Sequence, residues 1–258
     1  PTLDGIIHGA TNQIYQNAEE FYRAENGHAI GYFWGYKTAG LFQNQKEIND
    51  WIAAGNGIYQ ADVKPGDVKY VDVNHDGVIN ASDKVDLGNG LPKYTFGFNF
   101  SLAWKGFDLS ANFTGAAGFQ IAQSYRDPSS SQANYSRRIL KRWTGEGTSN
   151  EIPRVTYGDV GNWLFSDLYL QDGDYIRLQN LTMGYDFKKL ISWKGLSKMR
   201  LYFQVQNLFT LTKYDGMDPE IGSFNGTDGN SSDSWVSGVD MGYYPHPRTF
   251  IVGLNLAF

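Results

Sequence analysis

The feature that most constrains this chain is a strict alternation of apolar and polar residues along whole segments. In the run YTFGFNFSLAW, residues 94–104, every even position carries an aromatic or aliphatic side chain and every odd position a small or polar one. Successive side chains of a β-strand point to opposite faces, so this pattern predicts a strand with one apolar face. After the dipeptide Lys105-Gly106 the alternation resumes over residues 107–114. The two segments therefore predict a β-hairpin.

Three further alternating segments predict strands at residues 176–187, 199–206 and 249–258. In the first of these, the apolar phase shifts by one residue between Leu178 and Leu181, which predicts a β-bulge near Gln179 and Asn180. Nearer the start of the chain, the pattern predicts a strand over residues 30–42 and a short helix over residues 46–54.

The connections between these strands alternate in length. Those at residues 105–106 and 188–198 are short, whereas residues 43–93, 119–172 and 214–246 form long polar stretches. Short turns opposite long loops are typical of outer-membrane barrels, and strands of about ten residues exceed the usual length in soluble sheets. We therefore expect an all-β fold, an antiparallel transmembrane β-barrel segment with long extracellular loops. The alternative is a secreted, calcium-stabilised β-sandwich that binds carbohydrate and buries its apolar faces.

Charge and composition exclude several functional classes. The 22 basic and 27 acidic residues give a net charge of -5, which argues against a nucleic-acid partner. Aromatic residues make up 16% of the chain and glycines number 30, so an all-helical protein is also excluded. The chain has no cysteine, and it contains no G-x-S-x-G elbow, P-loop or G-x-G-x-x-G motif. We expect no enzymatic activity.

The segment DVNHDGVINASD, residues 72–83, has the spacing of an EF-hand calcium loop. Oxygen-bearing side chains stand at alternate positions, Gly77 occupies the sixth position, where the chain must turn sharply, and an aspartate replaces the usual glutamate at the twelfth. A polar turn that binds nothing is the alternative. We expect a structural Ca²⁺ held by Asp72, Asn74, Asp76, the carbonyl of Val78, and Asp83.

Several segments together resemble the C-terminal part of the SusC/RagA family of TonB-linked outer-membrane transporters. They are GYFWGYKTAGLFQ (31–43), PGDVKYVDVNHDGVINASDK (65–84), LPKYTFGFNFSLAWKGFDLSANFTGAAG (91–118), DYIRLQNLTMGYDF (174–187) and VQNLFTLTKYDGMDPEI (205–221). The resemblance implies a barrel of about 22 strands plugged by an N-terminal domain. It also implies localisation in the cell outer membrane and contact with its lipid. The implied partners are a SusD-like lipoprotein lid, TonB as the energy source, and an oligosaccharide or peptide as the imported substrate.

Under this resemblance, residues 1–258 are the C-terminal portion of a TonB-dependent receptor barrel. Residues 60–92 are expected to form an extracellular loop that carries the calcium motif. We find neither a TonB box nor a plug sequence, and half a dozen strands cannot close a plugged barrel. The expectation is therefore a fragment whose contact with TonB would be made by an N-terminal part that is missing here.

Aromatic residues supply two further expectations. The last residue, Phe258, ends an alternating strand and resembles the C-terminal aromatic that the outer-membrane assembly machinery reads. Aromatic side chains in the long loops could stack on sugar rings, although packing and membrane-interface positions are the commoner roles. These loop residues are Trp143, Tyr157, Trp163, Trp235, Tyr243 and Tyr244.

Overall fold

In a computed structural model, the chain forms two compact units. The first comprises residues 1–91, 120–171 and 221–242, and the second comprises residues 92–119, 172–220 and 243–258. Across both units, the described residues are 7–9, 21–123, 137–156, 161–191, 193–222, 237–240 and 242–258.

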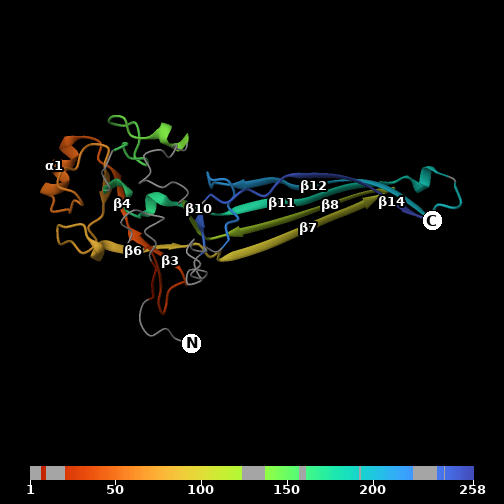
Figure 1. The fold of residues 1–258 in the computed structure, drawn as a ribbon, viewed down its shortest axis with the longest axis horizontal. Helices are drawn as coiled ribbons and strands as arrows, with labels where there is room; N and C mark the ends of the chain where they lie inside the picture. The colour runs from red at the N-terminus through yellow and green to blue at the C-terminus, as the bar shows by residue number, and fades with distance from the viewer. Residues whose placement is uncertain are drawn as a thin grey trace. The chain divides into compact units, whose positions relative to one another are not determined.

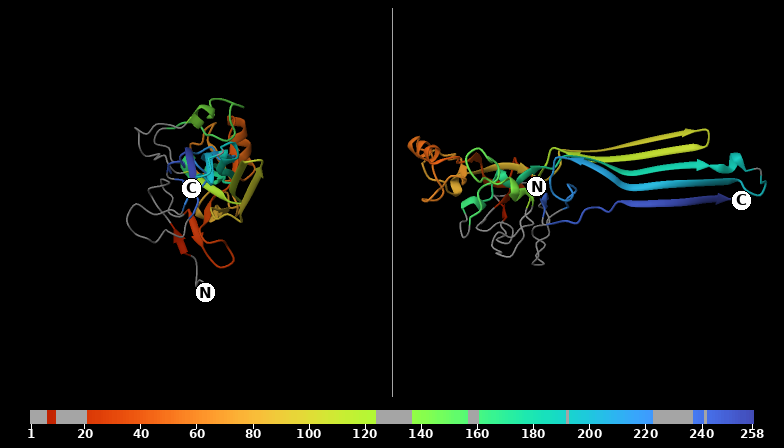
Figure 2. Two further views of the ribbon diagram at one scale, coloured as in Figure 1. Left: turned by 90° about the vertical axis from the view of Figure 1, so that its right-hand side faces the viewer. Right: turned by 90° about the horizontal axis from the view of Figure 1, so that it is seen from above.

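The second unit is a five-stranded antiparallel sheet in the order β14-β12-β11-β8-β7. Its strands run side by side in Figures 1 and 2, and the C terminus lies at the end of the sheet that carries the short connections. The predicted hairpin and the three later strands are thereby confirmed. The strands are β7 (Tyr94–Trp104), β8 (Phe107–Ala117), β11 (Tyr175–Asp186), β12 (Lys198–Thr212) and β14 (Thr249–Ala257).

The predicted bulge in β11 is confirmed as well. The register of β11 against both of its neighbours shifts between Leu178 and Asn180, so Gln179 is the extra residue. On β12, two residues lie between the partners of Leu178 and Asn180, and one of them, Asn207, has a φ of 51°. Asparagine tolerates this left-handed conformation better than most residues do. The irregularity therefore crosses two adjacent strands at the same level of the sheet.

The two faces of the sheet differ in character. One face carries a row of apolar side chains across all five strands, for example Leu102, Leu109, Met183, Phe203 and Val252. On the two edge strands this face is open, since Phe98 is 60% and Val252 72% exposed. The other face carries the row Asn99, Asn112, Asn180, Gln206 and Thr249. A β-sandwich would bury the apolar face, whereas a membrane barrel turns it to lipid.

The first unit contains three smaller sheets. They are β1 (Ile7–Gly9), β2 (Tyr22–Ala24), β3 (Tyr32–Tyr36) and β6 (Lys84–Asn89); β10 (Leu170–Asp172), β9 (Gln120–Gln123) and β13 (Val239–Asp240); and the pair β4 (Thr38–Leu41) and β5 (Val68–Tyr70). One buried cluster gathers Phe21, Tyr22, Phe33 and Phe165, and a second gathers Tyr36, Leu41, Val68 and Tyr70.

The helices of the described residues are short. The α-helix α1 (Gln45–Ala53) begins at Asn44, whose side chain accepts a hydrogen bond from the backbone N–H of Glu47. This cap satisfies one of the N–H groups that a helix leaves free at its start. The 3-10 helices are η1 (Ala81–Asp83), η2 (Arg137–Lys141), η3 (Gly161–Trp163), η4 (Asp167–Tyr169) and η5 (Phe187–Leu190). Among the described residues, no helix has the length and apolar content needed to cross a membrane.

One expected strand of the first unit needs correction. The strand expected over residues 30–42 is two strands, because the chain changes partner at Lys37: Tyr36 pairs with β6 and Thr38 with β5. The long polar connection 43–93 contains the expected helix, and it also contains the strands β5 and β6, which were not expected. Residues 60–92, expected to form an extracellular loop with the calcium motif, include β5, η1 and β6, and their extracellular position stays a prediction. Composition suggested a loop because these strands are short and rich in polar residues.

Candidate polar site on the sheet

The polar face of the five-stranded sheet carries a buried arginine at its middle strand. Arg177 of β11 is 3% exposed, and its backbone pairs with Thr114 of β8 and Thr210 of β12. Its Nε donates to the hydroxyl of Thr210 at 2.9 Å. A buried guanidinium needs compensating charge, because removal from water strongly disfavours an unpaired ion.

That charge comes from the segment that follows β12. Arg177 Nη2 donates to Asp218 Oδ1 at 2.5 Å, and Nη1 donates to Glu220 Oε2 at 2.8 Å. Asp218 is itself buried, whereas the Glu220 side chain is half exposed. The two carboxylates therefore tie the segment after β12 onto the polar face of β11.

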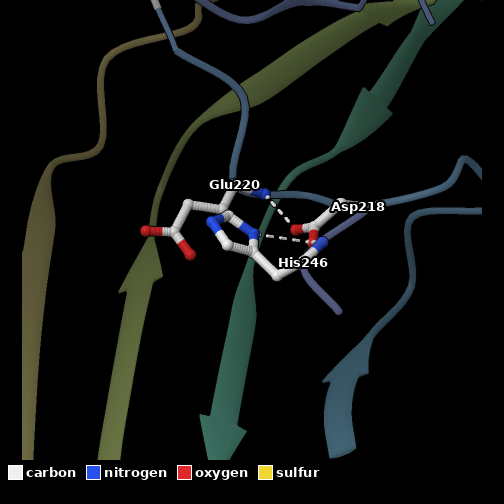
Figure 3. A group of neighbouring side chains, drawn as sticks. All are labelled: Asp218, Glu220 and His246. Carbon is white, nitrogen blue, oxygen red and sulfur yellow. Dashed lines mark hydrogen bonds and ion pairs between the residues drawn. The ribbon is translucent and has the colours of Figure 1, made fainter. Parts of the chain in front are cut away.

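The segment before β14 joins the same cluster through His246 (Figure 3). Its Nδ1 lies 3.0 Å from Arg177 Nη1 and 3.1 Å from Asp218 Oδ2. Nδ1 accepts from Arg177 when the proton is on Nε2, and it donates to Asp218 when Nδ1 carries the proton. The backbone N–H of His246 also donates to Asp218 Oδ2, at 3.1 Å.

Asp218 is the hub of these contacts. Burial raises the pKa of its carboxyl, but the backbone N–H groups of Glu220 and His246 and the side chains of His246 and Arg177 lower it. The net pKa lies below the ordinary aspartate value. Asp218 is therefore ionised at neutral pH and balances the charge of Arg177.

The cluster has some properties of a metal centre. One ligand atom from each of Asp218, Glu220 and His246 lies within 4.8 Å of the others, and no other His, Asp and Glu group in the described residues does this. However, the guanidinium of Arg177 already donates to both carboxylates and contacts the imidazole nitrogen. It supplies the positive charge that a cation would bring. We therefore interpret the cluster as an ion-pair network.

A polar pocket of about 410 Å³ lies beside the network. Arg177, Glu220 and His246 line one part of it. The rest is lined by five carboxamide side chains, those of Asn112, Gln179, Asn180, Gln206 and Asn207. Two of them, Gln179 and Asn207, are the residues displaced by the bulges in β11 and β12. The strand irregularities thus help to build the pocket.

A second ion pair crosses the polar face nearer the short turns. Arg200 of β12 donates from Nε and Nη2 to the two carboxylate oxygens of Asp108 on β8, at 2.7 and 2.5 Å. Between these strands lies β11, where Gly184 faces the guanidinium. A Cβ atom at Gly184 would lie 2.5 Å from Arg200 Nη2, so the absence of a side chain leaves room for the pair.

The residues expected to bind calcium lie in the first unit and form a compact loop held by side-chain to backbone bonds. Asp72 Oδ2 accepts from the N–H of Gly77 at 2.7 Å, and Asp76 Oδ1 accepts from the N–H of Val78 at 2.9 Å. Asn74 Oδ1 accepts from the N–H of Asp76 at 3.1 Å. The loop has the sharp turn that the motif predicts, with Gly77 at a φ of 82°.

Asp83, at the twelfth position, is fully buried and accepts from the N–H groups of Val73 and Asn80, at 2.9 and 2.8 Å. Burial raises the pKa of the Asp72 carboxyl, while backbone N–H groups of Gly77, His75 and Asp76 lower it to a net value below the ordinary one. Asp72, Asp76 and Asp83 do not form a trio with ligand atoms as close as those of the Asp218 cluster. Calcium binding by this loop remains a prediction.

The loop aromatics have different environments. Trp143 is partly buried against the second core cluster and donates from Nε1 to Gln43 at 3.3 Å, which is a packing role. Trp163 belongs to η3 and is partly buried, whereas Tyr243 and Tyr244 are exposed. Tyr157 and Trp235 lie outside the described residues.

The Arg177 cluster was not predicted from the sequence. Arg177, Asp218 and His246 are separated from one another by 28 to 69 positions, so no local motif connects them. One signal was available: Arg177 is a charged residue inside a predicted membrane strand, on its polar phase. An ionisable residue in such a place usually has a partner or a function.

The chain is similar to known proteins in sequence. No protein-family model matches it. It is 33% identical to the TonB-dependent receptor P3 of Formosa agariphila over 257 residues, which is 99% of this chain and 24% of that protein. It is 29% identical to the TonB-dependent receptor SusC of Bacteroides thetaiotaomicron, over 78% of this chain and 18% of SusC. The chain thus spans at most about a quarter of the length of these two relatives.

Solved structures show a similar fold. The structure of the RagAB peptide importer in the open-open state matches 95% of this chain and 24% of its own chain, with a TM-score of 0.61 and 20% identity. A structure of the RagAB peptide transporter matches with a TM-score of 0.62 over the same fractions. At this level of identity the likeness concerns the fold.

Proposed function

We propose that this chain, a relative of the TonB-dependent receptors of the SusC/RagA type, forms C-terminal wall strands and extracellular loops of an outer-membrane nutrient importer. The observation that carries the proposal is the two-faced sheet of five long strands. Its apolar face suits lipid and its polar face suits a water-filled pore. The relatives are receptors and importers, so the role we propose is not enzymatic.

The proposal extends to the energy source, the partner and the cargo. TonB would act through another part of the full-length receptor, and a SusD-like lipoprotein would cover the extracellular opening. The cargo would be an oligosaccharide or a peptide. These properties are supported by the similarity to SusC and to the RagAB peptide importer.

An uptake experiment tests this function by letting the cells select the cargo from a mixture. Three strains would be grown on a mixture of oligosaccharides and peptides: wild type, a deletion of the full-length receptor, and a deletion of TonB. Mass spectrometry would record which compounds disappear from the medium. We expect a defined set of compounds to remain in the receptor deletion, and the same set to remain in the TonB deletion. Equal depletion by the wild type and the receptor deletion would contradict the import function.

We also propose that residues 72–83 bind Ca²⁺ through Asp72, Asn74, Asp76, the Val78 carbonyl and Asp83. The support is the ligand spacing and the sharp turn at Gly77. Gathering carboxylates around one point is unfavourable without a cation, so Ca²⁺ would stabilise the loop. Outside the cell a dissociation constant of about 10⁻⁴ to 10⁻³ M would be sufficient.

Calorimetric titration of the purified full-length receptor with Ca²⁺ tests the loop. The Asp76→Ala variant should lose the binding heat that the wild type gives. A matched control is Asp62→Ala, which removes an exposed acidic residue outside the motif and should bind as the wild type does. Equal heats from the wild type and Asp76→Ala, or no heat from either, would contradict the proposal.

A further inference from the structure

The pocket beside Arg177 is lined only by polar side chains. Five carboxamides, one arginine, one glutamate and one histidine surround about 410 Å³, with no Phe, Tyr, Trp or aliphatic residue among them. Each carboxamide offers both donors and an acceptor. Within the described residues, Asn112, Gln179 and Gln206 have no side-chain hydrogen bond of their own, so these groups are available to a ligand.

The charge of the pocket disfavours an anion. Arg177 donates to Thr210, Glu220 and Asp218, and its Nη1 also contacts His246 Nδ1, so its guanidinium has little capacity left for a ligand carboxylate. Of the pocket's lining residues, Arg177 and Glu220 carry opposite charges that compensate each other, so this pair offers an anion no net positive charge. The exposed part of Glu220 accepts hydrogen bonds but cannot donate them when it is ionised.

We propose that this pocket binds a neutral oligosaccharide on its way through the pore. Sugar hydroxyls donate and accept hydrogen bonds around the whole edge of the ring, and they match carboxamides and a carboxylate. A peptide would bring apolar side chains for which the lining offers no partner. The inference rests on the proposed function, because it takes the polar face of the sheet as the face toward the pore.

The test uses the full-length receptor purified in detergent and measures binding by calorimetry. The neutral probes are maltohexaose, cellohexaose and xylohexaose, and the comparison probes are oligogalacturonate and a hexapeptide that contains leucine, valine and serine. The variant Gln179→Leu/Gln206→Leu removes two free carboxamides while keeping side-chain size. The control Thr182→Val lies on the same polar face but outside the pocket. Gln179→Leu alone is a second variant at an exposed position, in case the double variant does not fold.

We expect at least one neutral hexasaccharide to bind about tenfold more weakly to the double variant, because each lost hydrogen bond contributes about 1 kcal/mol. Gln179→Leu alone should weaken binding by about fivefold, and Thr182→Val should leave it unchanged within about twofold. The inference is overturned if no neutral probe binds, if the variants bind as the wild type does, or if only oligogalacturonate or the peptide depends on the carboxamides. Failure of the uptake experiment would instead count against the import function, whatever the pocket binds.

Discussion

At the scale of single residues, glycines on the polar face leave room for long side chains from neighbouring strands. Gly184 lies beneath the Arg200 guanidinium that reaches Asp108, two strands away. A similar close approach occurs at Gly253, where an added Cβ would lie 2.2 Å from the ring of Tyr202. In both places a small residue on one strand makes room for a long side chain from its neighbour.

This arrangement predicts the effect of Gly184→Ala. The new Cβ should displace the Arg200 side chain and break its paired bonds to Asp108, with a loss of about 1 kcal/mol of stability. The measurement is the midpoint of urea unfolding of the full-length receptor in detergent. Gly97→Ala is the matched control, because its nearest neighbour would be the Phe113 carbonyl oxygen at a comfortable 3.7 Å.

A double-mutant cycle separates this cause from a general effect of alanine in the strand. In an Arg200→Ala background, Gly184→Ala should cost little, since the clashing group is gone. An equal cost in both backgrounds would show that Gly184 matters for a different reason.

Residue chemistry also explains which site could be foreseen. The calcium motif is contiguous in sequence, so its spacing alone indicated the ligands Asp72, Asn74 and Asp76. The Arg177 network instead joins a strand to two segments that are distant in sequence, and only the sheet register brings them together. The register of the strands, and with it the proximity of these segments, cannot be predicted from a single sequence.

At the scale of elements, alternation was sufficient to predict the five long strands. Each strand has one apolar face and one polar face, so apolar residues recur at every second position of its sequence. In β11 this alternation shifts by one residue, and the shift correctly located the bulge. In the first unit, the strands β5 and β6 were not predicted from the sequence. They contain three and six residues, respectively. Such lengths are too short for a periodic signal, and their pairing depends on contacts across the fold.

The strand faces predict opposite outcomes for the same substitution at neighbouring positions. Phe98→Arg places a cation on the apolar face of β7 and should block assembly of the full-length receptor, at a cost of about 2–4 kcal/mol near the bilayer centre. Asn99→Arg places the same cation on the polar face and should assemble. Leu254→Arg on β14 should behave like Phe98→Arg.

Assembly would be followed as the amount of folded, heat-modifiable receptor in purified outer membranes. The contradictory result is normal folding of Phe98→Arg together with failure of Asn99→Arg, which would invert the two faces.

At the scale of the whole molecule, the sequence predicted the class of fold and the family resemblance, and both agree with the comparisons. The compact first unit was not predicted, because its aromatic core residues Phe21, Tyr22 and Phe33 come from segments without a regular pattern. Burial of such a cluster depends on distant contacts, including Phe165. The long strands can be predicted from the local alternation of residues, whereas the structure of the first unit depends on tertiary packing.

The central claim is that the five-stranded sheet is a wall between lipid and a water-filled pore. The chain has no cysteine, so single cysteines can carry a nitroxide spin label with no background from this segment. We would label Phe98→Cys and Asn99→Cys on β7, and Leu254→Cys and Asn255→Cys on β14, in the full-length receptor reconstituted in bilayers. Labels at 98 and 254 should relax with lipid-soluble oxygen, and labels at 99 and 255 with a water-soluble nickel chelate. Access of the nickel chelate to positions 98 and 254, or equal access to all four positions, would contradict the account.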